Sequence, residues 1–230
     1  MKNETTNQDQ AMITNEMKTA TVMVSAAVIA GVTQAAVGTP SVDELIAAIK
    51  SKDDKVRGPA WQSAGACGAP VVQPLAAVMT DPDFEIARSA RRAMWVIVRH
   101  AGRPGAEAER KAVQAALLPL LKDQPVPVRR EVLWMLSEIA DADAITPMAG
   151  LLTDAELRED ARCALTRVPH PQATQALDTA FKTAPEDFKS ALAESLRARG
   201  VTVAGYPSQK LKPTKETSLR ATSPAAKPGP

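Results

Sequence analysis

The feature that most constrains this chain is a nine-residue pattern that returns five times. The copies are VRGPAWQSA from Val56, IARSARRAM from Ile86, VRREVLWML from Val128, LREDARCAL from Leu157 and FKSALAESL from Phe188. Each copy starts with a large apolar residue, and apolar residues return four and eight places later. This spacing marks one face of an α-helix, so each copy predicts an amphipathic helix.

A second helical segment precedes each copy. Eleven residues before four of the five starts stand Leu45, Leu75, Leu117 and Leu177. Asp and Pro between the segments suit helix caps and first turns. In the fourth unit, Thr146 and Gly150 replace the usual apolar residues of the first helix. The starts are 30, 42, 29 and 31 residues apart (86−56, 128−86, 157−128, 188−157), and we interpret HAGRPGAEAER in the long interval as an extended loop.

This helix pair, with Asp shortly before an apolar–basic pair at the start of the second helix, resembles the HEAT repeat family. Over residues 41–200 it is most similar to the short bacterial HEAT-like repeats. The resemblance implies helix pairs stacked into a right-handed superhelix, and a non-enzymatic protein-binding scaffold. Aromatic residues make up only 3% of the chain, so Ala, Leu and Val supply the core volume, as suits closely packed helices. We therefore expect an all-α fold, an α-solenoid of about five stacked helix pairs over residues 39–202.

Residues 1–38 are typical of a leader with an export signal. From Met17 onward, one Lys precedes the apolar stretch 22–32, and small residues follow at 33–38. This is the order of a secretory signal peptide. Residues 1–16 carry Lys2 against three acidic residues, which is wrong for that role, so we expect Met17 to be the true start. The expected location is the bacterial periplasm or the medium. The alternatives are an uncleaved membrane anchor and a disordered tail on a cytoplasmic protein.

Residues 203–230 are rich in Pro, Ser, Thr and Lys, which predicts a disordered tail. From residue 210 onward five basic residues face one Glu, so 5−1 gives a charge of +4. The tail could tether the protein to an acidic surface, or it could be a plain solvated tail. Because the whole chain has a formal net charge of only +2, no nucleic-acid partner is predicted.

The three tryptophans indicate a binding surface. At about 100° per residue, they fall on the side of the second helices opposite the core. In a stacked solenoid we expect this side to line the concave groove. The predicted groove residues are Trp61, Arg88, Arg91, Arg92, Trp95, Arg130, Leu133, Trp134 and Arg162. Trp and Arg are enriched at interface hot spots, so the expected partner is another protein that offers an acidic or apolar segment.

Other interpretations stay open. Trp61 and Trp134 could fill gaps between neighbouring repeats, and the arginines could pair with Glu131, Glu159 or Asp160 along the stack. The protein could instead be an envelope-associated structural module held by its leader or its basic tail. A third possibility is an enzyme-like HEAT protein, such as a chromophore lyase or a helical-repeat DNA glycosylase.

No catalytic residue, metal site or cofactor is predicted. His100 and His170 stand in different repeats, whereas a zinc site needs three or four ligands. No Ser or Cys has a nearby His, and no Gly-rich phosphate loop follows a strand. Cys67 and Cys163 belong to units three repeats apart, too distant for a disulfide.

Overall fold

The computed structural model of the chain describes residues 38–122 and 124–208. These residues form ten α-helices and four short 3-10 helices, with no strand among them, which confirms the all-α class. Nearly all of the predicted leader and most of the predicted tail lie outside the described residues. Among the helices between residues 38 and 208, none combines the length and the apolarity needed to cross a bilayer.

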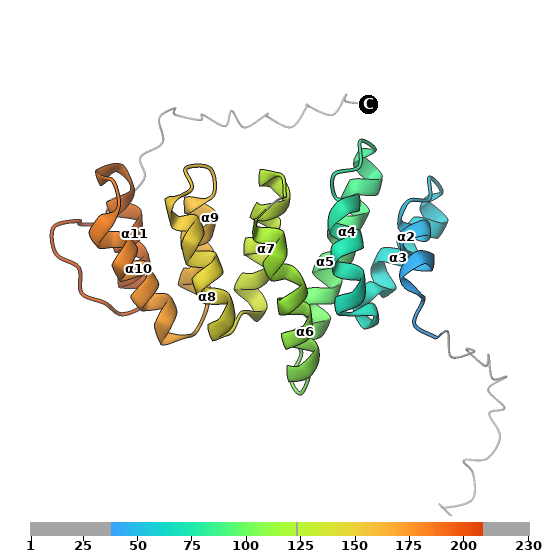
Figure 1. Cartoon of the computed structure of the whole chain (residues 1–230), viewed down its shortest axis with the longest axis horizontal. Coiled ribbons are helices and arrows are strands. Elements are labelled where there is room, and N and C mark those ends of the chain that lie inside the picture. The colour runs from blue at the N-terminus through green and yellow to red at the C-terminus, as the bar shows by residue number, and fades with distance from the viewer. Residues whose placement is uncertain (1–37, 123, 209–230) are drawn as a thin grey trace, which may run out of the picture. The chain divides into compact units, whose positions relative to one another are not determined.

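The α-helices form five consecutive pairs, which we call units 1 to 5. The pairs are α2 (Val42–Ile49) with α3 (Asp54–Ser63), α4 (Val72–Val78) with α5 (Phe84–Ala101), α6 (Glu107–Leu117) with α7 (Val126–Ile139), α8 (Ala142–Ala149) with α9 (Arg158–Arg167), and α10 (Pro171–Thr183) with α11 (Glu186–Ala198). The pairs stand side by side in chain order (Figure 1). Each second helix contacts the next, from α3 through α5, α7 and α9 to α11, so these helices form one layer. The predicted solenoid of five pairs is confirmed.

Helix α5 begins where the caps and the apolar spacing predict. The Asp83 carboxylate caps α5 by accepting hydrogen bonds from the backbone N–H groups of Glu85 at 2.9 Å and Ile86 at 3.3 Å. The apolar residues of the repeated pattern then face inward, and Val132 and Leu136 are fully buried. Burial of this face in successive units creates one continuous core between the two helix layers.

Unit 1 departs from the pattern by one position. Val56, expected in the core, is 46% exposed, while the neighbouring Arg57 is only 6% exposed. Unit 1 is the first of the described units, so no described unit covers Val56 from the other side. Arg57 turns inward instead, and its guanidinium is satisfied by the Ser51 carbonyl at 2.7 Å and by the Asp54 carboxylate.

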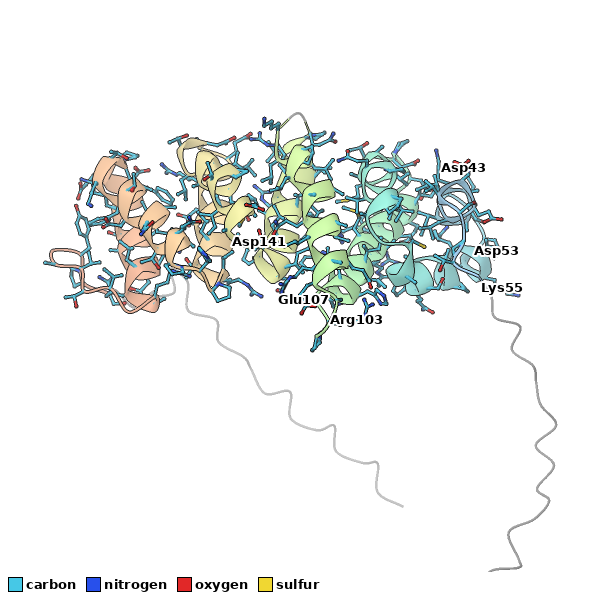
Figure 2. The ribbon with its side chains drawn as sticks, turned by 60° about the horizontal axis from the view of Figure 1, so that its bottom comes forward. Asp43, Asp53, Lys55, Arg103, Glu107 and Asp141 are labelled. Carbon is cyan, nitrogen blue, oxygen red and sulfur yellow. The ribbon has the colours of Figure 1, made fainter. Side chains whose placement is uncertain are left out.

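The predicted extended loop at residues 100–110 is wrong. Helix α5 continues to Ala101 and α6 begins at Glu107, so only residues 102–106 connect them. The turn carries Arg103 at one edge of the stack (Figure 2). Burial of Ile97, Val98 and Ala101 shows why: the apolar spacing of α5 runs past the expected helix end. The extra residues between the second and third pattern copies therefore belong mainly to helices α5 and α6 and not to a loop.

The fourth unit and the C-terminal end differ less from expectation. Ile145, Met148 and Leu152 are buried and supply the inner face of α8 and of the following 3-10 helix Gly150–Thr153.

After α11, residues 201–208 fold back onto unit 5, and we call them the strap. The Arg197 guanidinium donates to the Tyr206 carbonyl at 2.6 Å, and the Tyr206 ring meets Phe181 edge-on at 5.3 Å between centroids. Ordered packing thus extends past the predicted boundary at residue 202.

Candidate partner-binding surface

The predicted surface residues all lie on four helices of the second-helix layer, α3, α5, α7 and α9. The structure divides them into contacts between units, core positions and a small exposed group. This division depends on what stands beside each helix, because every inner second helix has a neighbour on both sides.

Helices α5 and α7 are joined by a shared carboxylate. On α5, Arg91 and Trp95 stand one turn apart, and both reach Glu131 on α7. The Trp95 indole Nε1–H donates to Glu131 Oε2 at 3.0 Å, and Arg91 Nη1 donates to Oε1 at 3.3 Å. We call this arrangement a carboxylate clamp: an Arg and a Trp four residues apart on one second helix, which hold a carboxylate of the next.

The same clamp returns one unit later. Arg130 Nε donates to Asp160 Oδ2 at 2.7 Å, and Trp134 Nε1–H donates to Asp160 Oδ1 at 3.0 Å. The Asp160 side chain is only 16% exposed, and its carboxylate raises the pKa of Arg130 through the hydrogen bond between them. For Trp134, the structure therefore favours packing between repeats over contact with a partner.

An exposed group of side chains lies across units 1 and 2. Trp61 of α3 and Arg92, Trp95 and Arg99 of α5 line a shallow depression of about 490 Å³, which we call the Trp–Arg patch. The Arg92 guanidinium lies 5.1 Å from the Trp61 ring centroid, and the Arg99 guanidinium lies 6.0 Å from that of Trp95. These distances suit cation–π contacts. Both arginines are exposed and both tryptophans are half-buried.

The cations of the patch have no acidic neighbour in the part of the chain that the structure describes. Neither Arg92 nor Arg99 has a carboxylate oxygen within 4.0 Å there. By contrast, Arg91 of the same helix and Arg130 of α7 are engaged in the clamps. The patch thus combines aromatic faces with two guanidinium groups that remain available to a ligand.

Leu133 was predicted to face the groove, and this is wrong. It is fully buried, because α7 is flanked by α5 and α9, so the sides of this helix are covered as well as its inner face. Arg162 is also drawn into a contact between units. Its side chain is 18% exposed, and its Nη1 donates to Ser195 Oγ of α11 at 2.7 Å.

The predicted residues Arg88 and Arg91 line a second, smaller depression. It measures about 230 Å³, and Met79, Phe84 and Val128 form part of its wall. Arg88 pairs with Glu85 at 2.5 Å and lies 5.7 Å from the Phe84 ring centroid. Phe84 is 69% exposed, so an apolar side chain stands beside these arginines.

The sequence analysis missed Arg99 as a member of the patch. It stands seven residues after Arg92 and four after Trp95, which are the spacings of one helix face. The signal was present, but the expected loop from His100 onward placed Arg99 at the end of the helix. Arg99 lies in the last turn of α5, which ends at Ala101.

The histidines, cysteines and carboxylates do not gather into a metal site in the described part of the chain. Among residues 38–122 and 124–208, no three His, Cys, Asp or Glu side chains gather in a way that could hold a metal ion. Cys67 and Cys163 are free thiols, and burial raises the pKa of Cys67, which disfavours its thiolate.

Comparison with known families gives a match over part of the stack. A family described as HEAT repeats matches residues 114–197. Comparison with curated proteins gives no match.

Several solved structures are similar to the chain. An engineered protein has 20% identity, with 68% of this chain and 78% of that one covered and a TM-score of 0.40. A designed armadillo repeat protein in complex with the peptide (KR)4 has 19% identity, coverages of 67% and 80%, and a TM-score of 0.41. Computationally designed armadillo repeat proteins for modular peptide recognition have 19% identity, the same coverages and a TM-score of 0.40.

Within residues 114–197, the basic residue at the second pattern position joins each unit to the next. Arg129 Nη2 donates to Asp154 at 3.2 Å, and its Nε donates to the Leu121 carbonyl at 2.9 Å. Arg158 donates to Asp187 at 2.6 Å. The Trp–Arg patch lies before residue 114, outside the matched HEAT segment.

Proposed function

We propose that the protein is a non-enzymatic scaffold that binds a segment of another protein on its second-helix layer, at the Trp–Arg patch. The observation that carries this proposal is the contrast between the patch and the clamps. The indole N–H groups of Trp95 and Trp134 donate to carboxylates of the next unit. Arg92 and Arg99, by contrast, expose their guanidinium groups to solvent beside aromatic rings. Trp and Arg together are the residues that most often dominate binding at interfaces.

The proposed site is smaller than the groove predicted from the sequence. It comprises Trp61, Arg92, Trp95 and Arg99, while Trp134 serves to join units. The depression beside Phe84 lies on the same helix α5, toward its N-terminal end, and offers an adjacent apolar contact. A bound segment that follows α5 would meet both.

Binding is tested by purifying the full-length protein from its own cells together with any protein that remains bound to it. This co-purified partner is then isolated and titrated into the chain by calorimetry. The patch variant Arg92→Glu/Arg99→Glu is expected to lose this binding. A charge-matched control, Arg103→Glu/Arg167→Glu, changes two exposed arginines outside the patch and is expected to bind normally. If no purified protein binds the chain, or if both variants bind equally well, the proposal is wrong.

Export is the second part of the proposal. It is supported by the order of Lys18, the apolar stretch 22–32 and the small residues at 33–38. Fractionation of native cells with mass measurement of the protein tests it. A chain in the periplasm or the medium that begins near residue 38 is expected. An intact chain in the membrane fraction would favour the envelope-associated module, and an intact chain in the cytosol would contradict export.

A further inference from the structure

We infer that the partner binds the Trp–Arg patch through an acidic, extended segment with two carboxylates three residues apart. This inference rests on the proposed function, because it names the chemistry of the partner at that site. It follows from the two clamps, which show within this same chain what ligand a Trp–Arg pair takes.

The first step is the position from which each clamp receives its carboxylate. Glu131 and Asp160 both stand three residues after the start of their repeat pattern, Val128 and Leu157. The residue at this position in α5 is Ser89, which is buried and only 3% exposed. At the junction of α3 with α5, the chain therefore supplies no acid at the position that fills the next two clamps.

The second step is what Trp61 does instead. In the part of the chain that the structure describes, the Trp61 indole N–H makes no hydrogen bond, unlike those of Trp95 and Trp134. Its ring is stacked against the Arg92 guanidinium at 5.1 Å. Arg57, the Arg four residues before Trp61, is turned inward onto Ser51 and Asp54. Junction 1–2 thus has an indole donor beside a guanidinium of the next helix, which are the two kinds of group that hold a carboxylate in the clamps.

The third step is charge complementarity. Arg92 and Arg99 lack a carboxylate within 4.0 Å among the described residues, so a ligand with negative charge gains two charge-assisted hydrogen-bond partners. An apolar segment would bury these guanidinium groups without compensation, which costs free energy. Of the acidic and apolar segments expected from the sequence, the patch fits the acidic one.

The fourth step is spacing. Arg92 and Arg99 stand seven residues apart on α5, so their backbones are separated by about 10.5 Å along the helix axis at 1.5 Å per residue. A segment in the extended polyproline II conformation has three residues per turn and advances about 3.1 Å per residue, so side chains three residues apart point to the same side. Two such carboxylates are about 9 Å apart and can reach the two guanidinium groups, while the residues between them pass over the Trp95 ring.

The test uses the full-length chain and labelled synthetic peptides followed by fluorescence anisotropy. One peptide carries Glu residues three apart among Gly, Ser and Ala, and a second carries Gln in their place. A third carries the two Glu side by side. We expect the first peptide to bind at least tenfold tighter than the second and several-fold tighter than the third. The difference is measured at low ionic strength, because exposed ion pairs weaken as salt is added.

Variants assign the binding to the patch. Arg92→Gln/Arg99→Gln is expected to abolish the preference for Glu, whereas the control Arg103→Gln/Arg167→Gln keeps it. A circular dichroism melt checks that both variants remain folded. Equal binding of the Glu and Gln peptides to the native chain would overturn the inference, as would an equal loss in the two variants. If the native partner still binds through the patch in that case, the proposed function stands and only the acidic chemistry is wrong.

Discussion

The substitution Trp134→Phe tests whether this tryptophan joins repeats or contacts a partner. It removes the indole N–H that donates to Asp160 at 3.0 Å, and it leaves the ring stem in place. A hydrogen bond to a charged acceptor contributes about 1.5–3 kcal/mol. Asp160 keeps its bond from Arg130, so we take the low end of that range and add about 0.5 kcal/mol for the smaller ring. The expected loss is about 2 kcal/mol.

The assay is chemical unfolding followed by far-ultraviolet circular dichroism, with Asp160→Ala and the double variant completing a cycle. In a parallel thermal melt, a loss of about 2 kcal/mol lowers the melting temperature by about 4–8 °C for a chain of this size. Groups in direct contact couple, and we expect a coupling energy of about 1 kcal/mol between positions 134 and 160. A loss below about 0.5 kcal/mol with no coupling would refute this reasoning and return Trp134 to the candidate binding residues.

Three further predictions concern units 3 to 5. Leu133→Ala should lower the free energy of unfolding by about 2–5 kcal/mol, measured by urea titration, because the side chain is fully buried; a neutral result would mean that it faces solvent. The Gln114 side chain lowers the pKa of Asp141 by donating to it at 2.6 Å. The folded pKa is depressed, so this contribution is present above the unfolded pKa of about 4 and is lost as pH falls through the folded pKa. Gln114→Ala should flatten the loss of stability below pH 4, and an unchanged slope would contradict the assignment. Tyr206→Phe removes the bond from the Tyr206 hydroxyl to Glu186 at 2.7 Å, so amide exchange in the strap should accelerate while that of α9 stays unchanged.

The fold was predictable because its signal is repeated. Apolar residues at fixed spacings in five copies identify five second helices, and the neighbouring leucines locate most of the first helices. The errors lie where one unit differs from the rest. Val56 is exposed because no described unit precedes it, and α5 outruns its expected end because Ile97 and Ala101 continue its buried face.

The candidate site was less predictable because an angle around a helix does not say what stands there. Leu133 and Trp134 both fall on the side of α7 opposite the predicted core face. Leu133 is nevertheless covered by neighbouring helices, and Trp134 donates to a carboxylate of the next unit. Arg92 differs from Arg91 by one position, and only Arg91 meets a carboxylate of α7. These outcomes depend on the side chains of the adjacent repeat, which become neighbours only when the stack forms.

The location of the patch also determines how binding would act on the stack. In a repeat array each unit contacts only its neighbours, so a unit at the end of the described array is held from one side. The patch joins unit 1 to unit 2 through the stacking of Arg92 on Trp61. A ligand that engages both units stabilises their contact by RT ln(1 + [L]/Kd), about 2.7 kcal/mol at a hundredfold excess over Kd. Amide exchange in α3 should then slow on binding much more than exchange in α9, because α9 lies two units beyond the site and its contacts do not change.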